Sequence, residues 1–179
     1  MTLEKETSEK QFKELLKALD ELEETLFIFT KANADPEGRK INSIIDDYVS
    51  ENPEKAIAFT SMGQLLYLST MQYVDAVVGN SSSGIMEAPS FKIGTINIGD
   101  RQKGRIRAES VIDCMPTYDS IKKALKRLYS QEFQMKLKKV KNPYGDGHTA
   151  ERIVKILKNF DICSVKKEFY RIGFRECII

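Results

Sequence analysis

The residues with the clearest chemical potential lie in one stretch, 75–107, which reads DAVVGNSSSGIMEAPSFKIGTINIGDRQKGRIR. This stretch predicts a buried strand at 76–78, a small polar loop at 79–84 and a short helix after the loop. In open α/β sheets, ligands bind at the carboxyl ends of strands, where helix N-termini direct free N–H groups outward. Glycines in the loop allow a close backbone approach, and Ser81 and Ser82 add hydroxyl donors. The loop therefore predicts an anion site that could hold a phosphate.

Two further features of the same stretch could complete such a site. Glu87 lies about one turn into the predicted helix, where its carboxylate could accept hydrogen bonds from neutral hydroxyls such as those of a ribose. A second strand is predicted at 95–98, and the loop after it carries Arg101, Lys103, Arg105 and Arg107. These cations could supply charge to the same phosphate. The pattern indicates a phosphorylated ligand with a sugar attached.

Each of these features also has a simpler interpretation. Serine and glycine are common in ordinary strand-to-helix turns. From spacing alone, Glu87 is equally well explained as a solvated residue or as a partner of the helix dipole. Runs of charge are usually solvated, so the basic loop that carries Arg101 is also explained as a solvated surface loop.

The elements that must position these residues alternate between apolar strands and amphipathic helices. Strands are predicted at 26–29, 56–59, 76–78, 95–98 and 111–114. Helices are predicted at 8–22, 36–48, 64–71, 84–91, 118–129, 131–139 and 149–160, with a weaker one at 165–170. Asp35 is expected to cap the second helix and Pro36 to open it. Such alternation is typical of βαβ units, so we expect one Rossmann-like, three-layer α/β domain with a mainly parallel sheet.

Composition narrows the class of protein. The 179 residues include 41% hydrophobic and 30% charged residues, and 28 Lys+Arg against 26 Asp+Glu leave a net charge of +2. This charge is too small to imply nucleic-acid binding. The cysteines Cys114, Cys163 and Cys177 form no CxxC pair, which predicts reduced thiols, and a single histidine argues against a zinc site. The polar start and the lack of a long apolar run predict a cytoplasmic protein without a signal peptide or membrane span.

Three segments together resemble the hydrolysing UDP-N-acetylglucosamine 2-epimerases. They are GNSSSGIMEAPSF, TINIGDRQKGRIRAESVIDC and NPYGDGHTAERI. The likeness is closest to the subgroup that makes N-acetylmannosamine for sialic-acid synthesis, and it covers essentially the whole chain. The resemblance implies the carboxyl-terminal half of a two-domain GT-B-type fold with UDP in the interdomain cleft. Residues 1–179 are accordingly expected to form a single UDP-binding domain with a helical tail at about 161–179.

The resemblance also implies roles for particular residues. Ser81 and Ser82 match the positions that hold the diphosphate, and Glu87 matches the acid that binds the uridine ribose. Arg101 matches an arginine of the nucleotide site. Two weaker correspondences are Met62, at an expected backbone contact to uracil, and Asn33, near another ligand-contacting position. The implied chemistry requires neither a metal nor a redox cofactor.

The same resemblance predicts what this chain does not supply. Family members move the C2 proton with carboxylates of the amino-terminal domain and a histidine just before the interdomain segment, and this chain is expected to begin after that histidine. His148 lies in a different motif and is interpreted as a turn residue. We therefore expect no catalytic acid or base here, UDP or UDP-N-acetylglucosamine as ligand, and the amino-terminal domain as partner. Self-association is also expected, because a cleft domain without its partner exposes an apolar face.

Three functions remain open at this point. The first is the UDP-binding half of an epimerase that forms N-acetylmannosamine and UDP. The second is a fragment or regulator that binds a uridine nucleotide without turnover. The third is the nucleotide-sugar domain of a GT-B glycosyltransferase, over which the second and third quoted segments favour the epimerase.

Overall fold

The computed structural model describes residues 8–33 and 35–160 and divides the chain into two compact units, Met1–Tyr144 and Gly145–Ile179. The strands of the first unit are β1 (Phe27–Thr30), β2 (Ala56–Phe59), β3 (Ala76–Gly79), β4 (Gly94–Ile98) and β5 (Val111–Cys114). Its helices are α1 (Ser8–Asp20), α2 (Pro36–Glu51), α3 (Gly63–Thr70), α4 (Ser83–Met86), η1 (Ala88–Phe91), α5 (Tyr118–Leu128) and α6 (Gln131–Leu137). The second unit contains α7 (Thr149–Lys158).

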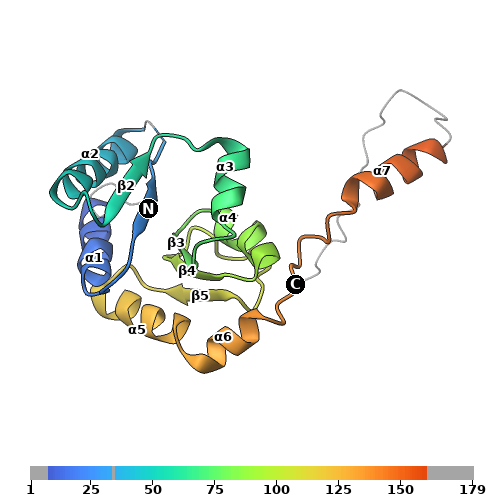
Figure 1. The fold of residues 1–179 in the computed structure, drawn as a ribbon. Coiled ribbons are helices and arrows are strands. Elements are labelled where there is room, and N and C mark those ends of the chain that lie inside the picture. The colour runs from blue at the N-terminus through green and yellow to red at the C-terminus, as the bar shows by residue number, and fades with distance from the viewer. Residues whose placement is uncertain (1–7, 34, 161–179) are drawn as a thin grey trace, which may run out of the picture. The chain divides into compact units, whose positions relative to one another are not determined.

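Every strand pair in the first unit is parallel, as the alternation of elements predicts. β1 pairs with β2, and β3, β4 and β5 form a separate three-stranded sheet in that order. The three-stranded sheet lies between α4 and α5, so helices cover both of its faces (Figure 1). A Rossmann-like α/β fold is therefore confirmed. One difference from the expected single sheet is that β1 and β3 do not pair, and a cavity is lined by residues of both strands.

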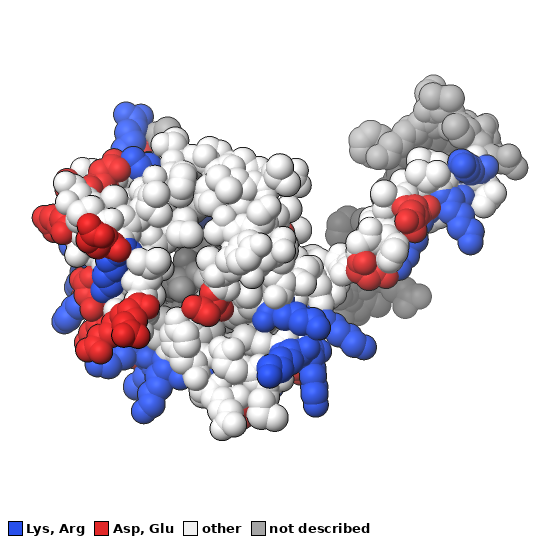
Figure 2. Space-filling model, viewed as in Figure 1, with Lys and Arg blue, Asp and Glu red and all other residues white. Residues whose placement is uncertain are grey.

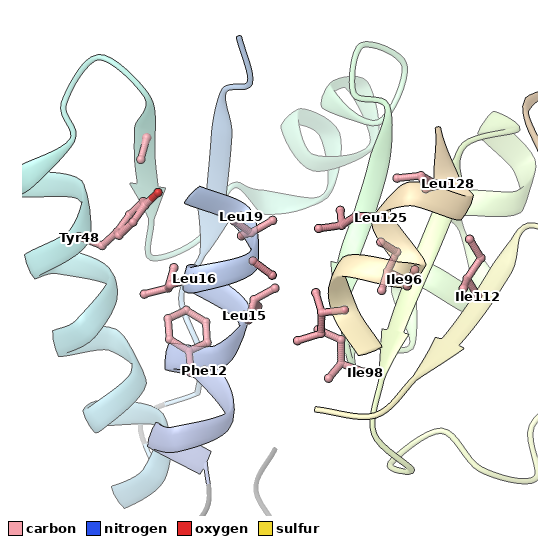
Figure 3. Close-up of a cluster of buried hydrophobic side chains, with 14 of the residues drawn as sticks. Phe12, Leu15, Leu16, Leu19, Tyr48, Ile96, Ile98, Ile112, Leu125 and Leu128 are labelled. Carbon is pink, nitrogen blue, oxygen red and sulfur yellow. The ribbon is translucent and has the colours of Figure 1, made fainter. Parts of the chain in front are cut away.

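The main core joins the helical layer to both sheets. Figure 3 shows Phe12, Leu15, Leu16 and Leu19 of α1 facing the core, as their spacing on one helix face predicts. Leu125 and Leu128 of α5 lie against Ile96, Ile98 and Ile112 of the three-stranded sheet. Burial of these side chains fixes the sheet whose carboxyl edge carries the candidate site.

The start of α2 confirms the predicted cap. Asp35 accepts a 2.7 Å hydrogen bond from the backbone N–H of Gly38, and Pro36 occupies the first turn. Gly38 has no room for a side chain, because a Cβ there would lie 1.9 Å from the carbonyl oxygen of Asn33. The cap and this close contact hold the loop between β1 and α2 against the first turn of α2.

The single continuous helix predicted at 84–91 is wrong, because two shorter helices lie there. A four-residue α-helix, α4, is followed by the separate 3₁₀ helix η1. Pro89 has no backbone N–H and cannot continue the α-helical hydrogen-bond ladder, so the first helix ends before it. The helix predicted at 165–170 and the tail at 161–179 lie outside the described residues. Across the described ranges, no helix is both long and apolar enough to cross a membrane.

Charge is unevenly distributed over the surface. On the face that Figure 2 shows, acidic and basic side chains are mixed over α1 and α2, whereas an uncharged area covers α3 and α4. No charged residue occurs in α3, whose sequence is GQLLYLST, and Leu65 and Leu66 on this helix are exposed. The face beside the candidate site is therefore partly apolar.

Candidate functional site

A cavity of about 900 Å³ is lined by residues of both β1 and β3. Part of its polar lining comes from segments that follow the carboxyl ends of β1, β3 and β4, and another part from residues before β1 and β3, namely Glu24, Thr25, Tyr73 and Asp75. The polar residues after the carboxyl ends are Lys31, Asn33, Asn80, Ser81, Ser82, Arg101, Gln102 and Arg105. The carboxyl ends of parallel strands are the usual place for ligands in α/β folds. The cavity is therefore the candidate binding site of this unit.

The structure brings four of the six predicted site residues together. Asn33, Ser81, Ser82 and Arg101 all line the cavity. The other two lie on neighbouring elements: Glu87 is an exposed residue at the end of α4, and Met62 directly precedes α3. Among the described residues, neither of these two contributes to the cavity lining.

The loop between β3 and α4 presents unoccupied donors. Within residues 8–33 and 35–160, the backbone N–H groups of Ser81 and Ser82 make no hydrogen bond. The Ser81 hydroxyl accepts a 3.3 Å hydrogen bond from the backbone N–H of Ser83, which bends the loop toward α4. Gly79 has a φ of 145°, a conformation that glycine adopts more readily than other residues. Such a loop can offer both N–H groups and hydroxyls to an anion.

Gly84 has a different role from the one that loop composition predicts. A Cβ at this position would lie 2.5 Å from the Cγ2 methyl of Thr95 on β4. The Thr95 hydroxyl also donates a 2.6 Å hydrogen bond to the Gly84 carbonyl. Gly84 therefore allows α4 to pack closely on the sheet.

Tyr67 on α3 is a residue of this region that the sequence analysis missed. Its hydroxyl lies 2.7 Å from the hydroxyl of Ser83, so α3 contacts the first residue of α4. Burial raises the pKa of Tyr67, and the nearby negative charge of Glu87 raises this pKa further. Tyr67 thus links α3 to the helix that carries Glu87. Nothing in the local sequence indicates this contact, because the two hydroxyls belong to separate elements.

The basic loop after β4 is anchored at its far end. Arg107 donates a 2.8 Å hydrogen bond to Asp113 on β5, and Asp113 also accepts one from Asn97 on β4 at 2.7 Å. Arg107 is consequently committed to a structural ion pair, whereas Arg101 and Arg105 are exposed and line the cavity. Asp113 thus has two hydrogen-bond partners, Arg107 and Asn97.

The surroundings of Cys114 and His148 do not indicate a nucleophile or a base. Burial and the negative charge of the adjacent Asp113 carboxylate together raise the pKa of the Cys114 thiol to about 11, which disfavours the reactive thiolate. His148 lies at the cap position before α7, as expected of a turn residue, with its Nδ1 3.2 Å from Glu151. In the part of the chain that the structure describes, no group of three or more His, Cys, Asp or Glu residues could hold a metal ion.

The sequence model of one protein family, UDP-N-acetylglucosamine 2-epimerase, matches residues 1–158. The chain belongs to this family. Among curated proteins, this epimerase-family chain is 45% identical over 166 residues to GDP/UDP-N,N'-diacetylbacillosamine 2-epimerase (hydrolyzing) of Campylobacter jejuni, with 92% of the chain covered. It is 35% identical over 179 residues to polysialic acid biosynthesis protein P7 of Escherichia coli, with 98% of the chain covered. The predicted resemblance is thereby confirmed.

The chain spans less than half of these two relatives, 43% and 45% of their lengths, and matches their carboxyl-terminal halves. A solved structure of MnaA from S. aureus with UDP shares the fold, with a TM-score of 0.67 and 18% identity. That comparison covers 88% of this chain and 42% of the other. This epimerase-family chain is accordingly one half of a GT-B-type fold, as the sequence predicts.

Proposed function

We propose that this chain is the UDP-binding half of a hydrolysing UDP-sugar 2-epimerase. One observation carries the proposal: Asn33, Ser81, Ser82 and Arg101 line a single cavity beside β1 and β3. Family membership and the coverage of carboxyl-terminal halves support the same assignment. The substrate we propose is UDP-N-acetylglucosamine, and the products are N-acetylmannosamine and UDP for sialic-acid or surface-polysaccharide synthesis.

The diphosphate would lie against the loop between β3 and α4. There, the backbone N–H groups and hydroxyls of Ser81 and Ser82 would donate to its oxygens, and Arg101 would supply positive charge. Glu87 would accept hydrogen bonds from the ribose, and the backbone of Met62 would contact the uracil. Asn33 would reach the ligand from the opposite wall of the cavity.

These contacts would assist catalysis by stabilising the leaving group. In the proposed reaction, loss of the C2 proton and departure of UDP give a glycal, to which water then adds with reprotonation on the opposite face. Negative charge grows on the diphosphate as the bond to the sugar breaks. Fixed donors aimed at developing charge are a major source of catalysis. The groups that move the C2 proton would come from the other half of the enzyme.

A second candidate substrate is a UDP-linked diacetylated amino sugar. The observation that favours it is the 45% identity to the diacetylbacillosamine epimerase of C. jejuni, which exceeds the 35% identity to the polysialic acid protein. Both substrates present the same nucleotide to this half. The choice between them therefore depends on contacts to the sugar.

Calorimetric titration of the 179-residue chain with UDP tests the nucleotide site. We expect saturable binding that weakens about tenfold in Ser82→Ala and more in Arg101→Ala, because charge-assisted hydrogen bonds are the stronger ones. Ser43→Ala, an exposed serine on α2, is the control and should bind like the wild type. No heat at millimolar UDP would refute the proposal.

Turnover needs a separate experiment. The chain is mixed with a separately expressed amino-terminal half and each candidate UDP-sugar, and released UDP is measured. Release of UDP by the mixture, but not by the isolated chain, supports the role of an enzyme half. Binding of UDP without release by the mixture would instead support a non-catalytic nucleotide binder, and release by the isolated chain would show that it carries its own catalytic groups.

A further inference from the structure

Gln102 is a buried carboxamide in an otherwise exposed loop. Its exposed fraction is 3%, although Arg101 before it and Lys103 after it are both exposed. Removing a carboxamide from water costs free energy unless hydrogen bonds replace those made to water. The burial of Gln102 therefore requires a structural or functional reason.

The side chain of Gln102 joins the two loops of the candidate site. Its Nε2 donates a 2.7 Å hydrogen bond to the carbonyl oxygen of Asn80. Asn80 lies between the end of β3 and Ser81. This bond therefore holds the loop between β3 and α4, residues 80–82, here called the serine loop, to the basic loop that carries Arg101. The orientation of the carboxamide follows from the contact, since Oε1 placed against the Asn80 carbonyl would put two acceptors together.

The backbone of Gln102 is fixed from the opposite side. Its carbonyl oxygen accepts a 3.0 Å hydrogen bond from Nη2 of Arg107, whose Nη1 donates to Asp113. Asp113 in turn accepts from Asn97, which is buried in β4. A continuous chain of hydrogen bonds thus runs from the strands to the Asn80 carbonyl.

The other end of the carboxamide has no partner. Oε1 of Gln102 is buried, and within the described residues it makes no hydrogen bond. Gln102 also lines the cavity together with Ser81 and Ser82. A side chain that served stability alone would be expected to satisfy this acceptor, because an unpaired buried acceptor is destabilising.

From this geometry we infer that Gln102 is a positioning residue of the anion site, which sets the serine loop relative to Arg101 through the Asn80 carbonyl. The inference rests on the proposed function for the identity of the ligand. The coupling between the two loops is independent of the proposed function, because the hydrogen bond from Gln102 to Asn80 is present without a ligand. Gln102 acts through the position that it gives the loop.

Gln102→Met tests this role, because methionine keeps the length of the side chain and removes both polar atoms. We expect the affinity for UDP to fall about five- to tenfold, the effect of one net hydrogen bond, and the affinity for uridine to stay within about twofold. The matched control is Gln134→Met, since Nε2 of Gln134 also donates a 2.7 Å hydrogen bond to a backbone carbonyl, that of Leu128. This control should bind both ligands like the wild type.

Amide hydrogen exchange of the ligand-free chain provides a second readout. In Gln102→Met, we expect faster exchange for the amides of Ile85, Met86 and Glu87, which are hydrogen-bonded to Ser82 and Ser83. Unchanged exchange in this segment would overturn the inference whether or not UDP binds. Equal loss of UDP and uridine affinity would also overturn it. If the wild type fails to bind UDP while exchange responds as expected, the proposed function fails and the positioning role stands.

Discussion

Thr95 and Gly84 meet across the boundary between sheet and helix. The Thr95 hydroxyl donates a 2.6 Å hydrogen bond to the Gly84 carbonyl, and its methyl group occupies the space that a side chain on Gly84 would need. Because Gly84 follows the serine loop, this contact sets how closely the loop approaches β4. The packing of a single glycine thus positions the donors of the candidate site.

Gly84→Ala should destabilise the chain. The new Cβ would lie 2.5 Å from Cγ2 of Thr95, so either the helix or the strand must shift. We expect the free energy of unfolding, measured by urea denaturation, to fall by about 1–3 kcal/mol, as overpacking usually causes. Adding Thr95→Ser to the variant removes the clashing methyl and keeps the hydroxyl, so it should recover part of the loss. A fully stable Gly84→Ala would contradict the packing role.

Tyr67→Phe should loosen the start of α4. The substitution removes the hydroxyl that lies 2.7 Å from Ser83 and keeps the ring in place. We expect a loss of about 0.5–1.5 kcal/mol in the free energy of unfolding and a fall of a few fold in UDP affinity by calorimetry. Tyr144→Phe is the control for affinity, because the exposed Tyr144 hydroxyl also makes a hydrogen bond, 2.9 Å to the carbonyl oxygen of Ile106, and Tyr144 does not line the cavity. Equal behaviour of the two variants would remove Tyr67 from the site.

Leu128→Ala and Leu65→Ala should differ sharply. Leu128 is 1% exposed between α5 and the sheet, whereas Leu65 on α3 is 84% exposed. Truncation of a buried leucine costs about 2–5 kcal/mol, because it removes contacts and leaves a cavity. At the exposed position we expect a change within about 0.5 kcal/mol. Chemical denaturation of both variants measures the contrast, and a large loss in Leu65→Ala would show that α3 is covered.

The Cys114 thiol should react slowly with iodoacetamide. Its pKa is raised to about 11 by burial and by Asp113, so at pH 8 the thiolate fraction is about 100-fold below that of an ordinary cysteine with a pKa near 9. Peptide-resolved mass spectrometry should show a rate that rises about tenfold per pH unit from pH 7.5 to 9.5. The rate for a thiol with a pKa near 9 rises by only about threefold between pH 8.5 and 9.5. A rise of that size for Cys114 would show an ordinary thiol.

Local elements of the fold were readable from the sequence, and their long-range relations were not. β2 and β5 have the predicted bounds, since short apolar runs between turn residues mark buried strands. Pro89 was visible in the sequence, but the predicted helix was extended through it. The separation of β1 from β3 depends on packing over the whole unit.

The candidate site follows the same division. Ser81, Ser82 and Arg101 could be selected because they follow the carboxyl ends of predicted strands, where ligands bind in α/β sheets. The structure places all three on one cavity. Tyr67 and Gln102 carry no such signal. Tyr67 contacts Ser83, 16 residues away, and Gln102 contacts Asn80, 22 residues away, so a local sequence pattern does not reveal either contact.

Because α4 is short, the affinity of this edge of the sheet for an anion should depend on ionic strength. A helix of four residues aligns few peptide dipoles, so its field is weaker than that of a longer helix. Long-range attraction then comes mainly from the exposed guanidinium groups of Arg101 and Arg105, which dissolved salt screens over about 8 Å at physiological concentration. Capture of a diphosphate would accordingly weaken as salt is added, while the short-range donors of the serine loop would still determine where it rests.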